Sequence, residues 1–124
     1  DAKLVICEVD KDHPFVSTEM MMPVLAIVRV KDIDEAIDLA VKAEHGCRHS
    51  AHIHSKNIDN LTRFARAVET TIFVKNAPSY AGIGAGGEGY TTFTIAGPTG
   101  EGLTAAHSFT RSRRCVMVDG LHIV

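Results

Sequence analysis

In residues 17–24, whose sequence is STEMMMPV, a single carboxylate directly precedes an apolar segment of three methionines. Glu19 is followed by three methionines and then by Pro23. An ionised carboxylate accepts several hydrogen bonds, and the polarizable methionine side chain fills irregular apolar gaps. Two interpretations are open. The segment is either a loop that leads into a buried strand, with methionine as filler, or a site that places a charged acceptor beside an apolar surface.

Histidines and cysteines are further candidates for chemistry. His52 and His54 alternate along an expected strand and could bind a metal from one face, but no cysteine or carboxylate stands at ligand spacing around them. We interpret them as partly solvated strand residues. The three cysteines, Cys7, Cys47 and Cys115, form no CxxC pair, which indicates reduced, intracellular thiols. Cys7 and Cys115 lie among Val, Ile and Met, so we expect both to be buried and inert.

A glycine-rich stretch and a basic cluster resemble phosphate-binding motifs. Gly84, Gly86 and Gly89 formally match GxGxxG, but that fingerprint belongs between the first strand and helix of a βαβ unit. Here the glycines follow a third expected strand and lead into YTTFT, without a helix start. We interpret residues 84–89 as a flexible loop, and we predict that residues 81–89 bind no dinucleotide phosphate by themselves. Residues 111–114, RSRR, are interpreted as a solvated or interface-forming edge.

The composition limits the possible functions. Thirteen Lys and Arg against fifteen Asp and Glu give a formal charge of −2, so nothing indicates nucleic acid or an anionic membrane surface as a partner. No apolar run approaches the length of a membrane span. The 124 residues allow one domain at most. The sequence begins directly with a strand-like pattern, DAKLVICEV, which favours a fragment of a longer protein.

The sequence contains two similar units, each a β-type stretch followed by a helical pattern, and these elements must position the candidate residues. VLAIVRV is followed by KDIDEAIDLAVKAEHG, and SAHIHS is followed by KNIDNLTRFARAVE, so each unit runs from a β-type stretch through K-[D/N]-I-D into a helical pattern. The sequence TTIFVKN then predicts a third strand. The order βαβαβ with short links predicts an α/β fold with a parallel sheet. We expect strands 24–30 and 50–55 to be adjacent, with both helices covering the sheet.

Apolar spacing predicts helices at Ile33–Glu44 and Ile58–Val68. Their apolar faces comprise Ile33, Ala36, Ile37, Ala40 and Val41 in the first helix and Ile58, Leu61, Phe64, Ala65 and Val68 in the second. Asp32 is a predicted N-cap with Glu35 three residues on, and Gly46 is placed as the C′ glycine. After the glycine-rich connection we expect a short helix at residues 103–108 and a final strand within RRCVMVDGLHIV.

Three stretches of the chain carry a family resemblance. They are EMMMPV, the block DEAIDLAVKAEHGCRHSAHIHSKNIDNLTRFARA, and TFTIAGPTGEGLTAAHSFTRSRRCVMV. Together they resemble the C-terminal portion of the aldehyde dehydrogenase superfamily. Within it they resemble the coenzyme A-acylating branch, which includes the propanediol- and ethanolamine-utilisation enzymes of bacterial microcompartments. The stretch GGEGYTTFTIAGPTGEGLT is specific to that branch, whereas the helical block is typical of the whole superfamily.

The resemblance implies roles for particular residues. In the family a Glu stands two residues before an apolar side chain and four before a Pro-Val pair. Its carboxylate holds the nicotinamide ribose hydroxyls, and the apolar group packs near the ring. Those roles fall on Glu19 and Met21, although many relatives carry an aromatic residue at the second position. A later family pattern matches FTIAGPTGEG, so Phe93, with Thr94 and Ile95, would line the aldehyde pocket.

The reaction implied by the resemblance is oxidation of a short-chain aldehyde, propionaldehyde or acetaldehyde, to its acyl-CoA. Hydride passes from a cysteine thiohemiacetal to NAD, and coenzyme A takes over the resulting thioester. The family's nucleophilic cysteine and dinucleotide domain lie upstream of the Glu motif and are not in this chain. We therefore expect the chain to be inactive alone. The alternative is a non-catalytic α/β binding or oligomerisation module.

The resemblance also implies an organisation and a location. Residues 1–110 would be the C-terminal part of the catalytic domain, and residues 111–124 would be a strand that joins subunits into a homo-oligomer. The implied partners are an aldehyde, NAD and coenzyme A, with no nucleic acid and no membrane. The implied location is the cytoplasm or the lumen of a bacterial microcompartment.

Overall fold

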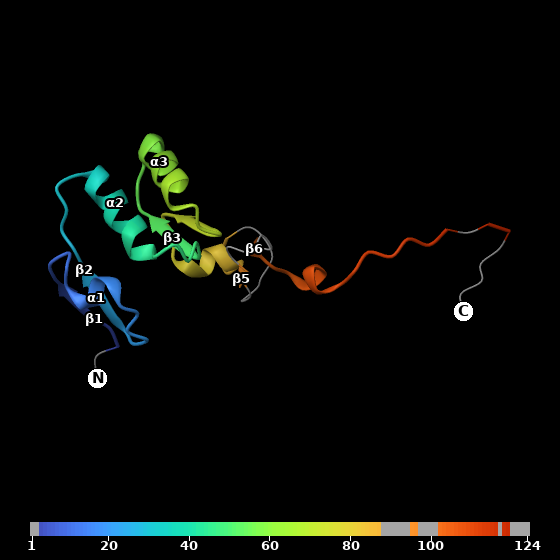
Figure 1. Ribbon diagram of the computed structural model, residues 1–124, viewed down its shortest axis with the longest axis horizontal. Coiled ribbons are helices and arrows are strands. Elements are labelled where there is room, and N and C mark those ends of the chain that lie inside the picture. The colour runs from blue at the N-terminus through green and yellow to red at the C-terminus, as the bar shows by residue number, and fades with distance from the viewer. Residues whose placement is uncertain (1–2, 88–94, 97–101, 117, 120–124) are drawn as a thin grey trace.

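The computed structural model describes residues 3–87, 95–96, 102–116 and 118–119 (Figure 1). From β2 to β4 the strands and helices alternate along the chain as the sequence predicts, whereas α1 was not predicted. The elements are β1 (Val5–Glu8), α1 (Pro14–Ser17), β2 (Val24–Ile27), α2 (Ile33–Glu44), β3 (Ser50–Ile53), α3 (Ile58–Val68), β4 (Ile72–Lys75), the 3-10 helix η1 (Ser79–Ile83), β5 (Ile95–Ala96), β6 (Gly102–Leu103) and the 3-10 helix η2 (Ala106–Phe109).

The long strands form two parallel pairs. β1 pairs with β2, with Val5 opposite Val24, and β3 pairs with β4, with Ser50 opposite Ile72. The predicted α/β class and parallel strands are therefore confirmed. The expected adjacency of strands 24–30 and 50–55 is wrong, because β2 pairs with β1 and β3 with β4. Each strand is recognisable from its own residues, but its partner depends on how distant segments meet, and consecutive strands need not pair.

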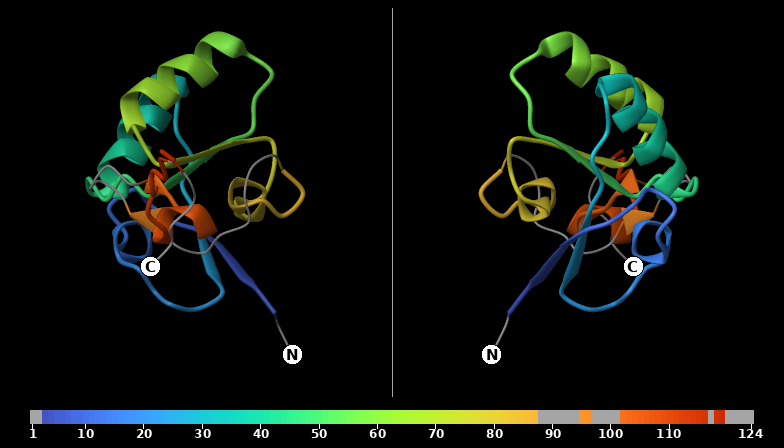
Figure 2. Two further views of the ribbon diagram at one scale, coloured as in Figure 1. Left: turned by 90° about the vertical axis from the view of Figure 1, so that its right-hand side faces the viewer. Right: turned by 90° about the vertical axis from the view of Figure 1, so that its left-hand side faces the viewer.

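Helices α2 and α3 lie together on one side of β3 and β4 (Figure 2). The core between these layers is formed by Ile37, Ala51, Phe64 and Val68, all buried. The Phe64 ring meets Phe73 edge-on, with ring centroids 5.6 Å apart. Arg63 of α3 also forms an ion pair with Asp34 of α2. The two crossover helices are thus packed on each other as well as on the strand pair.

Local capping explains where α2 begins and ends. The Asp32 side chain accepts a hydrogen bond from the Glu35 N–H at 2.9 Å, which confirms the predicted N-cap. The Glu35 carboxylate accepts from the Lys31 N–H at 2.9 Å, one residue before the N-cap. α2 ends at Glu44 and is followed by His45, whose backbone is left-handed with φ 57°, and by Gly46 with φ 74°. Gly46 therefore occupies the predicted C′ position.

Several sequence-based expectations differ from the structure. The helix expected at residues 103–108 is replaced by β6 and the 3-10 helix η2. Residues 110–116 and 118–119 form no strand, and the rest of the expected final strand lies outside the described residues. Cys115 is exposed and Cys7 only half-buried, so the expectation that both are buried is wrong for Cys115. In the described part of the chain, no element packs over residues 110–116, which extend away from the layers (Figure 1).

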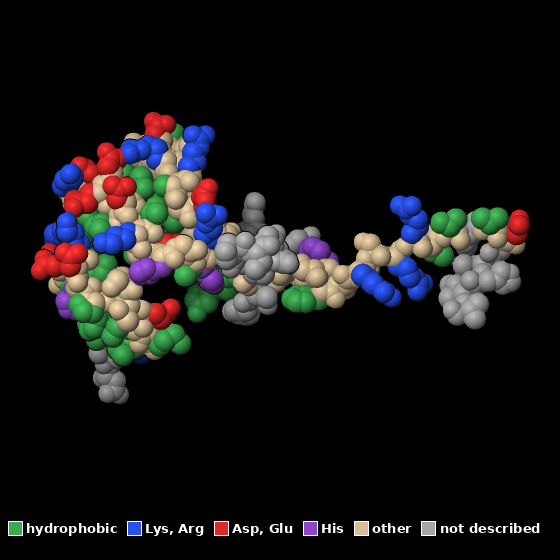
Figure 3. Space-filling model, viewed as in Figure 1, with side chains coloured by type: hydrophobic (Ala, Val, Ile, Leu, Met, Phe, Trp, Pro, Cys, Tyr) green, Lys and Arg blue, Asp and Glu red, His purple; other side chains and the backbone are tan. Residues whose placement is uncertain are grey.

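The β1–β2 pair carries apolar side chains that the chain leaves uncovered. Val5, Ile6 and Leu25 are about half exposed, at 51%, 60% and 50%. Figure 3 shows apolar side chains gathered over this end of the molecule, whereas charged side chains cover the end with α2 and α3. Burial of such surface is the main force that stabilises a parallel sheet, and parallel sheets are ordinarily covered on both faces. Within the described residues, no helix has the length and apolar character to cross a membrane.

Candidate functional site

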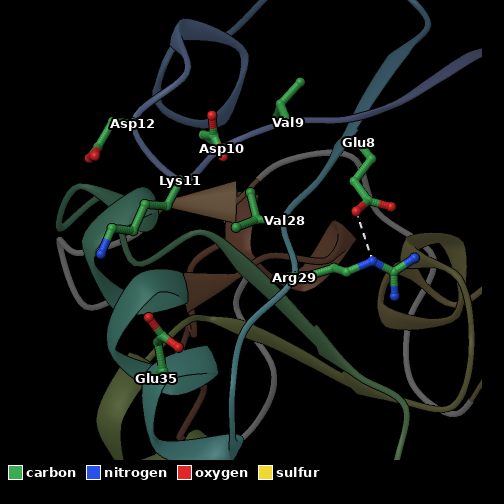
Figure 4. Close-up of a pocket in the computed structure, with 8 residues that line it drawn as sticks. All are labelled: Glu8, Val9, Asp10, Lys11, Asp12, Val28, Arg29 and Glu35. Carbon is green, nitrogen blue, oxygen red and sulfur yellow. Dashed lines mark hydrogen bonds and ion pairs between the residues drawn. The ribbon is translucent and has the colours of Figure 1, made fainter.

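Several surface hollows of the described chain contain residues that could do chemistry, and two of them are large. The larger, of about 730 Å³, lies where β1 and β2 end (Figure 4). Its charged lining comprises Glu8, Asp10, Lys11, Asp12, Arg29 and Glu35. Arg29 Nε donates to Glu8 Oε1 at 2.7 Å, and both side chains are well exposed. In the described residues no group of His, Cys, Asp and Glu is arranged to hold a metal. This hollow is a solvated surface of mixed charge and contains no residue that the sequence analysis assigns to a site.

The second hollow, of about 530 Å³, contains Glu19 and is called the Glu19 hollow below. It lies between the end of α1, the loop after it, the end of α2 and the start of β3. Its lining is Val16, Ser17, Thr18, Glu19, Ala43, Glu44, His45, Cys47, His49 and Ser50. The sequence segments 16–19 and 43–50 are therefore brought together by the fold.

Glu19 lies on the exposed loop between α1 and β2. Among the described residues its carboxylate has no hydrogen-bond or ion-pair partner, so both oxygens are available to a ligand. An ionised carboxylate accepts hydrogen bonds only, and therefore suits a ligand with hydroxyl donors. A nucleotide ribose presents such donors, so the residues of this hollow fit the expected cofactor at that point.

Met21 is placed differently from Glu19. It is 88% exposed, has a left-handed backbone with φ 49°, and is not part of the hollow's lining. The structure therefore brings Glu19, but not Met21, to the hollow. The exposed position leaves the Met21 side chain free of packing within the described chain.

The expected aldehyde-pocket residues are described only in part. Ile95 is half-buried in β5, where it pairs with Leu103 in an antiparallel bridge. Ile95 does not line the Glu19 hollow. Phe93 and Thr94 lie outside the described residues.

The segment 44–50 supplies functional groups that the sequence analysis did not assign. The Glu44 carboxylate accepts from the His49 N–H at 2.9 Å, and His49 Nδ1 is 2.6 Å from Ser50 Oγ. His45 Nε2 is 3.1 Å from the Ser17 carbonyl oxygen. Cys47 is exposed in the same hollow. The sequence signal for this cluster was its dense run of ionisable residues, EHGCRH, directly after a predicted helix end.

The remaining candidates have structural explanations. His52, in β3, and His54, directly after it, are exposed, as expected for solvated residues, although His54 is not part of the strand. His52 Nε2 is 2.8 Å from Ser79 Oγ. Residues 81–83 belong to the 3-10 helix η1 and residues 84–87 follow it, with φ of 90° at Gly84 and 79° at Gly86. No α-helix begins within the described part of this stretch, and the absence of phosphate binding there stays a prediction.

Comparison with known proteins identifies a matching family and several similar proteins. A model described as "Aldehyde dehydrogenase family" matches residues 3–112. The chain is 57% identical over 122 residues to acetaldehyde dehydrogenase (acetylating) EutE of Salmonella typhimurium. It is 55% identical over 121 residues to propanal dehydrogenase (CoA-propanoylating) of the same organism. Each match covers 98% of this chain and 26% of the relative, so the chain spans about a quarter of the length of these curated relatives.

Solved structures give the same result. The Rhodopseudomonas palustris propionaldehyde dehydrogenase with bound CoA and an acylated cysteine is 61% identical, with a TM-score of 0.85 over 92% of this chain and 26% of that one. A propionaldehyde dehydrogenase from the Clostridium phytofermentans fucose utilisation bacterial microcompartment is 62% identical, with a TM-score of 0.84 over 95% of this chain and 27% of that one. An engineered glycolyl-CoA reductase with bound NADP+ is 61% identical, with a TM-score of 0.85 over 92% of this chain and 26% of that one.

Proposed function

The chain belongs to the aldehyde dehydrogenase family, and we propose that it is the C-terminal portion of an NAD-dependent, CoA-acylating aldehyde dehydrogenase. The complete enzyme would oxidise propionaldehyde or acetaldehyde to the acyl-CoA through a cysteine thioester. The observation that carries the proposal is the identity of 55–57% to acetylating and CoA-propanoylating relatives over almost the whole chain. The exposed apolar residues of β1 and β2 support it further, because a longer protein would cover them.

Glu19 would hold the nicotinamide ribose in that enzyme. Its unpartnered carboxylate faces a hollow large enough to admit part of a ligand, on a loop that enters a parallel strand. Two ribose hydroxyls can donate to the two carboxylate oxygens, which fixes the sugar and so orients the ring beside it. The cofactor supplies the acceptor for hydride when it is bound. Met21 would pack near the ring, which requires the exposed side chain to be covered by the cofactor or by another part of the enzyme.

The aldehyde pocket would receive one wall from Phe93, Thr94 and Ile95. The half-buried position of Ile95 in β5 is compatible with a side chain that lines such a wall. None of the residues in this chain is assigned to coenzyme A, which would act as co-substrate of the complete enzyme. The three cysteines are likewise not assigned as nucleophiles, although Cys47 lies in the Glu19 hollow.

Residues 1–110 would form part of the catalytic domain, and residues 111–124 would join subunits into a homo-oligomer. The described part of the second segment runs away from the layers, and Val116 and Val118 are 74% and 73% exposed (Figure 1). Apolar side chains on an extended segment favour pairing with another chain. We place the enzyme in the cytoplasm or the lumen of a bacterial microcompartment, as the relative from the fucose utilisation microcompartment suggests.

The test of this function is NADH production by the full-length protein. With propionaldehyde or acetaldehyde we expect NADH formation that depends on coenzyme A, and acyl-CoA as the product identified by mass spectrometry. Residues 1–124 alone should produce no NADH under the same conditions. A full-length protein that forms no acyl-CoA from either aldehyde would refute the enzymatic proposal and favour a non-catalytic module.

A further inference from the structure

His45 joins two segments that are far apart in the sequence. It follows the last residue of α2, and its left-handed backbone turns the chain out of the helix. Its Nε2 is 3.1 Å from the carbonyl oxygen of Ser17, 28 residues earlier. A carbonyl oxygen can only accept, so this ring nitrogen carries the proton in the contact. The contact therefore holds the end of α2 against the end of α1.

The Ser17 carbonyl belongs to the last residue of α1. The final carbonyls of a helix have no partner within the helix, and a histidine side chain can satisfy one of them. In α1 the last intrahelical bond runs from the Thr18 N–H to the Pro14 carbonyl at 2.9 Å. The His45 ring thus anchors the point at which α1 ends and the loop bearing Glu19 begins.

The loop is also anchored at its other end. Beyond Met21, the Pro23 carbonyl accepts from the Val5 N–H at 2.9 Å, which joins the loop to β1. Residues 18–22 therefore lie between two hydrogen-bonded residues, Ser17 and Pro23. Glu19 lies two residues from the His45 anchor and four from Pro23, so the His45 contact has the greater influence on where its carboxylate lies.

We propose that His45 is a positioning residue for Glu19: by holding the Ser17 carbonyl, it keeps the Glu19 carboxylate in the hollow where the nicotinamide nucleotide binds. The inference rests on the proposed binding role of Glu19. His45 acts on the nucleotide through the loop, and its loss should weaken nucleotide binding without changing affinity for the aldehyde.

Two substitutions of His45 separate its hydrogen bond from its backbone conformation. His45→Asn keeps a residue type that adopts the left-handed conformation readily, but its shorter amide does not reach the Ser17 carbonyl. His45→Gln places an N–H donor at about the position of Nε2. In the full-length enzyme we expect His45→Asn to raise the dissociation constant of NADH, measured by fluorescence titration, by about three- to tenfold, the effect of one hydrogen bond. His45→Gln should recover to within about twofold of the wild type.

Steady-state kinetics should likewise distinguish an effect on NAD from an effect on the aldehyde. In His45→Asn the KM for NAD should rise while the KM for propionaldehyde stays unchanged. His54→Asn serves as the matched control, because His54 is an exposed histidine outside the Glu19 hollow, and it should behave as the wild type.

A double variant identifies the route by which His45 acts. Once Glu19→Ala has removed the carboxylate, adding His45→Asn should have no further effect on NADH binding. If the two losses add in full, or if His45→Asn alone binds NADH as the wild type does, the positioning role is overturned while the role of Glu19 stands. If Glu19→Ala itself binds NADH normally, the binding role of Glu19 is overturned, and the inference about His45 falls with it.

Discussion

The side chain of Asn76 forms two hydrogen bonds with the main chain of Ser55, one with its N–H and one with its carbonyl. Its Oδ1 accepts from the Ser55 N–H at 2.8 Å, and its Nδ2 donates to the Ser55 carbonyl at 3.0 Å. The Asn76 N–H also donates to the Ile53 carbonyl at 2.9 Å, which extends the β3–β4 ladder by one bond. Asn76 adopts φ 54°, a left-handed conformation that asparagine tolerates better than most residues. These contacts close the carboxyl ends of β3 and β4.

Asn76→Ala should destabilise this end of the sheet. It removes two hydrogen bonds and places alanine at a positive φ, so we expect a loss of about 2–3 kcal/mol in local stability. The measurement is hydrogen exchange of the Ser55 amide in the full-length protein. Asn60→Ala is the matched control, because the Asn60 side chain has no hydrogen bond among the described residues and lies on α3. Equal Ser55 protection in both variants would contradict the role assigned to Asn76.

Glu19→Ala should impair use of the nicotinamide cofactor. Loss of a charged acceptor for ribose hydroxyls is expected to cost about 1.5–3 kcal/mol, or at least about tenfold in kcat/KM for NAD. Asp38→Ala is the control, because Asp38 is an exposed carboxylate on α2 outside the Glu19 hollow. Near-wild-type kinetics of Glu19→Ala would remove this residue from the cofactor site.

Cys47→Ser should leave the full-length enzyme active. Cys47 lies in the same hollow as Glu19, so it is the cysteine of this chain whose role most needs a test. Serine is a far weaker nucleophile at neutral pH, and replacing a true nucleophile would reduce kcat by at least about a thousandfold. We expect kcat to stay within about threefold of the wild type, since the Cys47 thiol is exposed and a substitution at an exposed position ordinarily changes little. A collapse of acyl-CoA formation would identify Cys47 as the nucleophile.

Phe64→Ala should loosen the packing between α3 and β4. Phe64 is buried and meets Phe73 edge-on, and removal of such a ring ordinarily costs about 3–5 kcal/mol. We expect faster hydrogen exchange across α3 and β4 and a lower melting temperature. Phe109→Ala, at a phenylalanine that is 72% exposed, should change neither. Unchanged protection in Phe64→Ala would show that this layer does not depend on the Phe64 ring.

Val116→Asp should shift the assembly toward smaller species. Val116 is 74% exposed on the extended segment that we propose to join subunits, and a buried unpaired charge there would oppose association. Light scattering on the full-length protein measures the change. Phe109→Asp introduces the same charge at an exposed position outside residues 111–124 and should leave the assembly intact. Identical masses for wild type and Val116→Asp would refute the assignment of this segment.

Helices α2 and α3 could be predicted to the residue because their determinants are local. The apolar spacing, the caps Asp32 and Asn57 and the glycine after His45 all act within about one helical turn. Two face assignments failed: Ile58 is 68% exposed and Val41 is 37% exposed. Both lie at the margin of an apolar stripe, where the neighbouring layer decides whether a side chain is covered.

The sequence by itself determined the alternation of strands and helices from β2 to β4, the parallel class, both long helices and the choice of Glu19 as a candidate, since each is encoded in short-range patterns. Only the tertiary structure decided that β2 pairs with β1, that Met21 lies outside the hollow, and that His45 reaches Ser17. The physical reason is that strand partners and loop anchors are contacts between distant segments. Their formation depends on the entropy of closing the intervening chain and on how the layers between the two segments pack. Neither quantity can be derived from a single short stretch of the sequence.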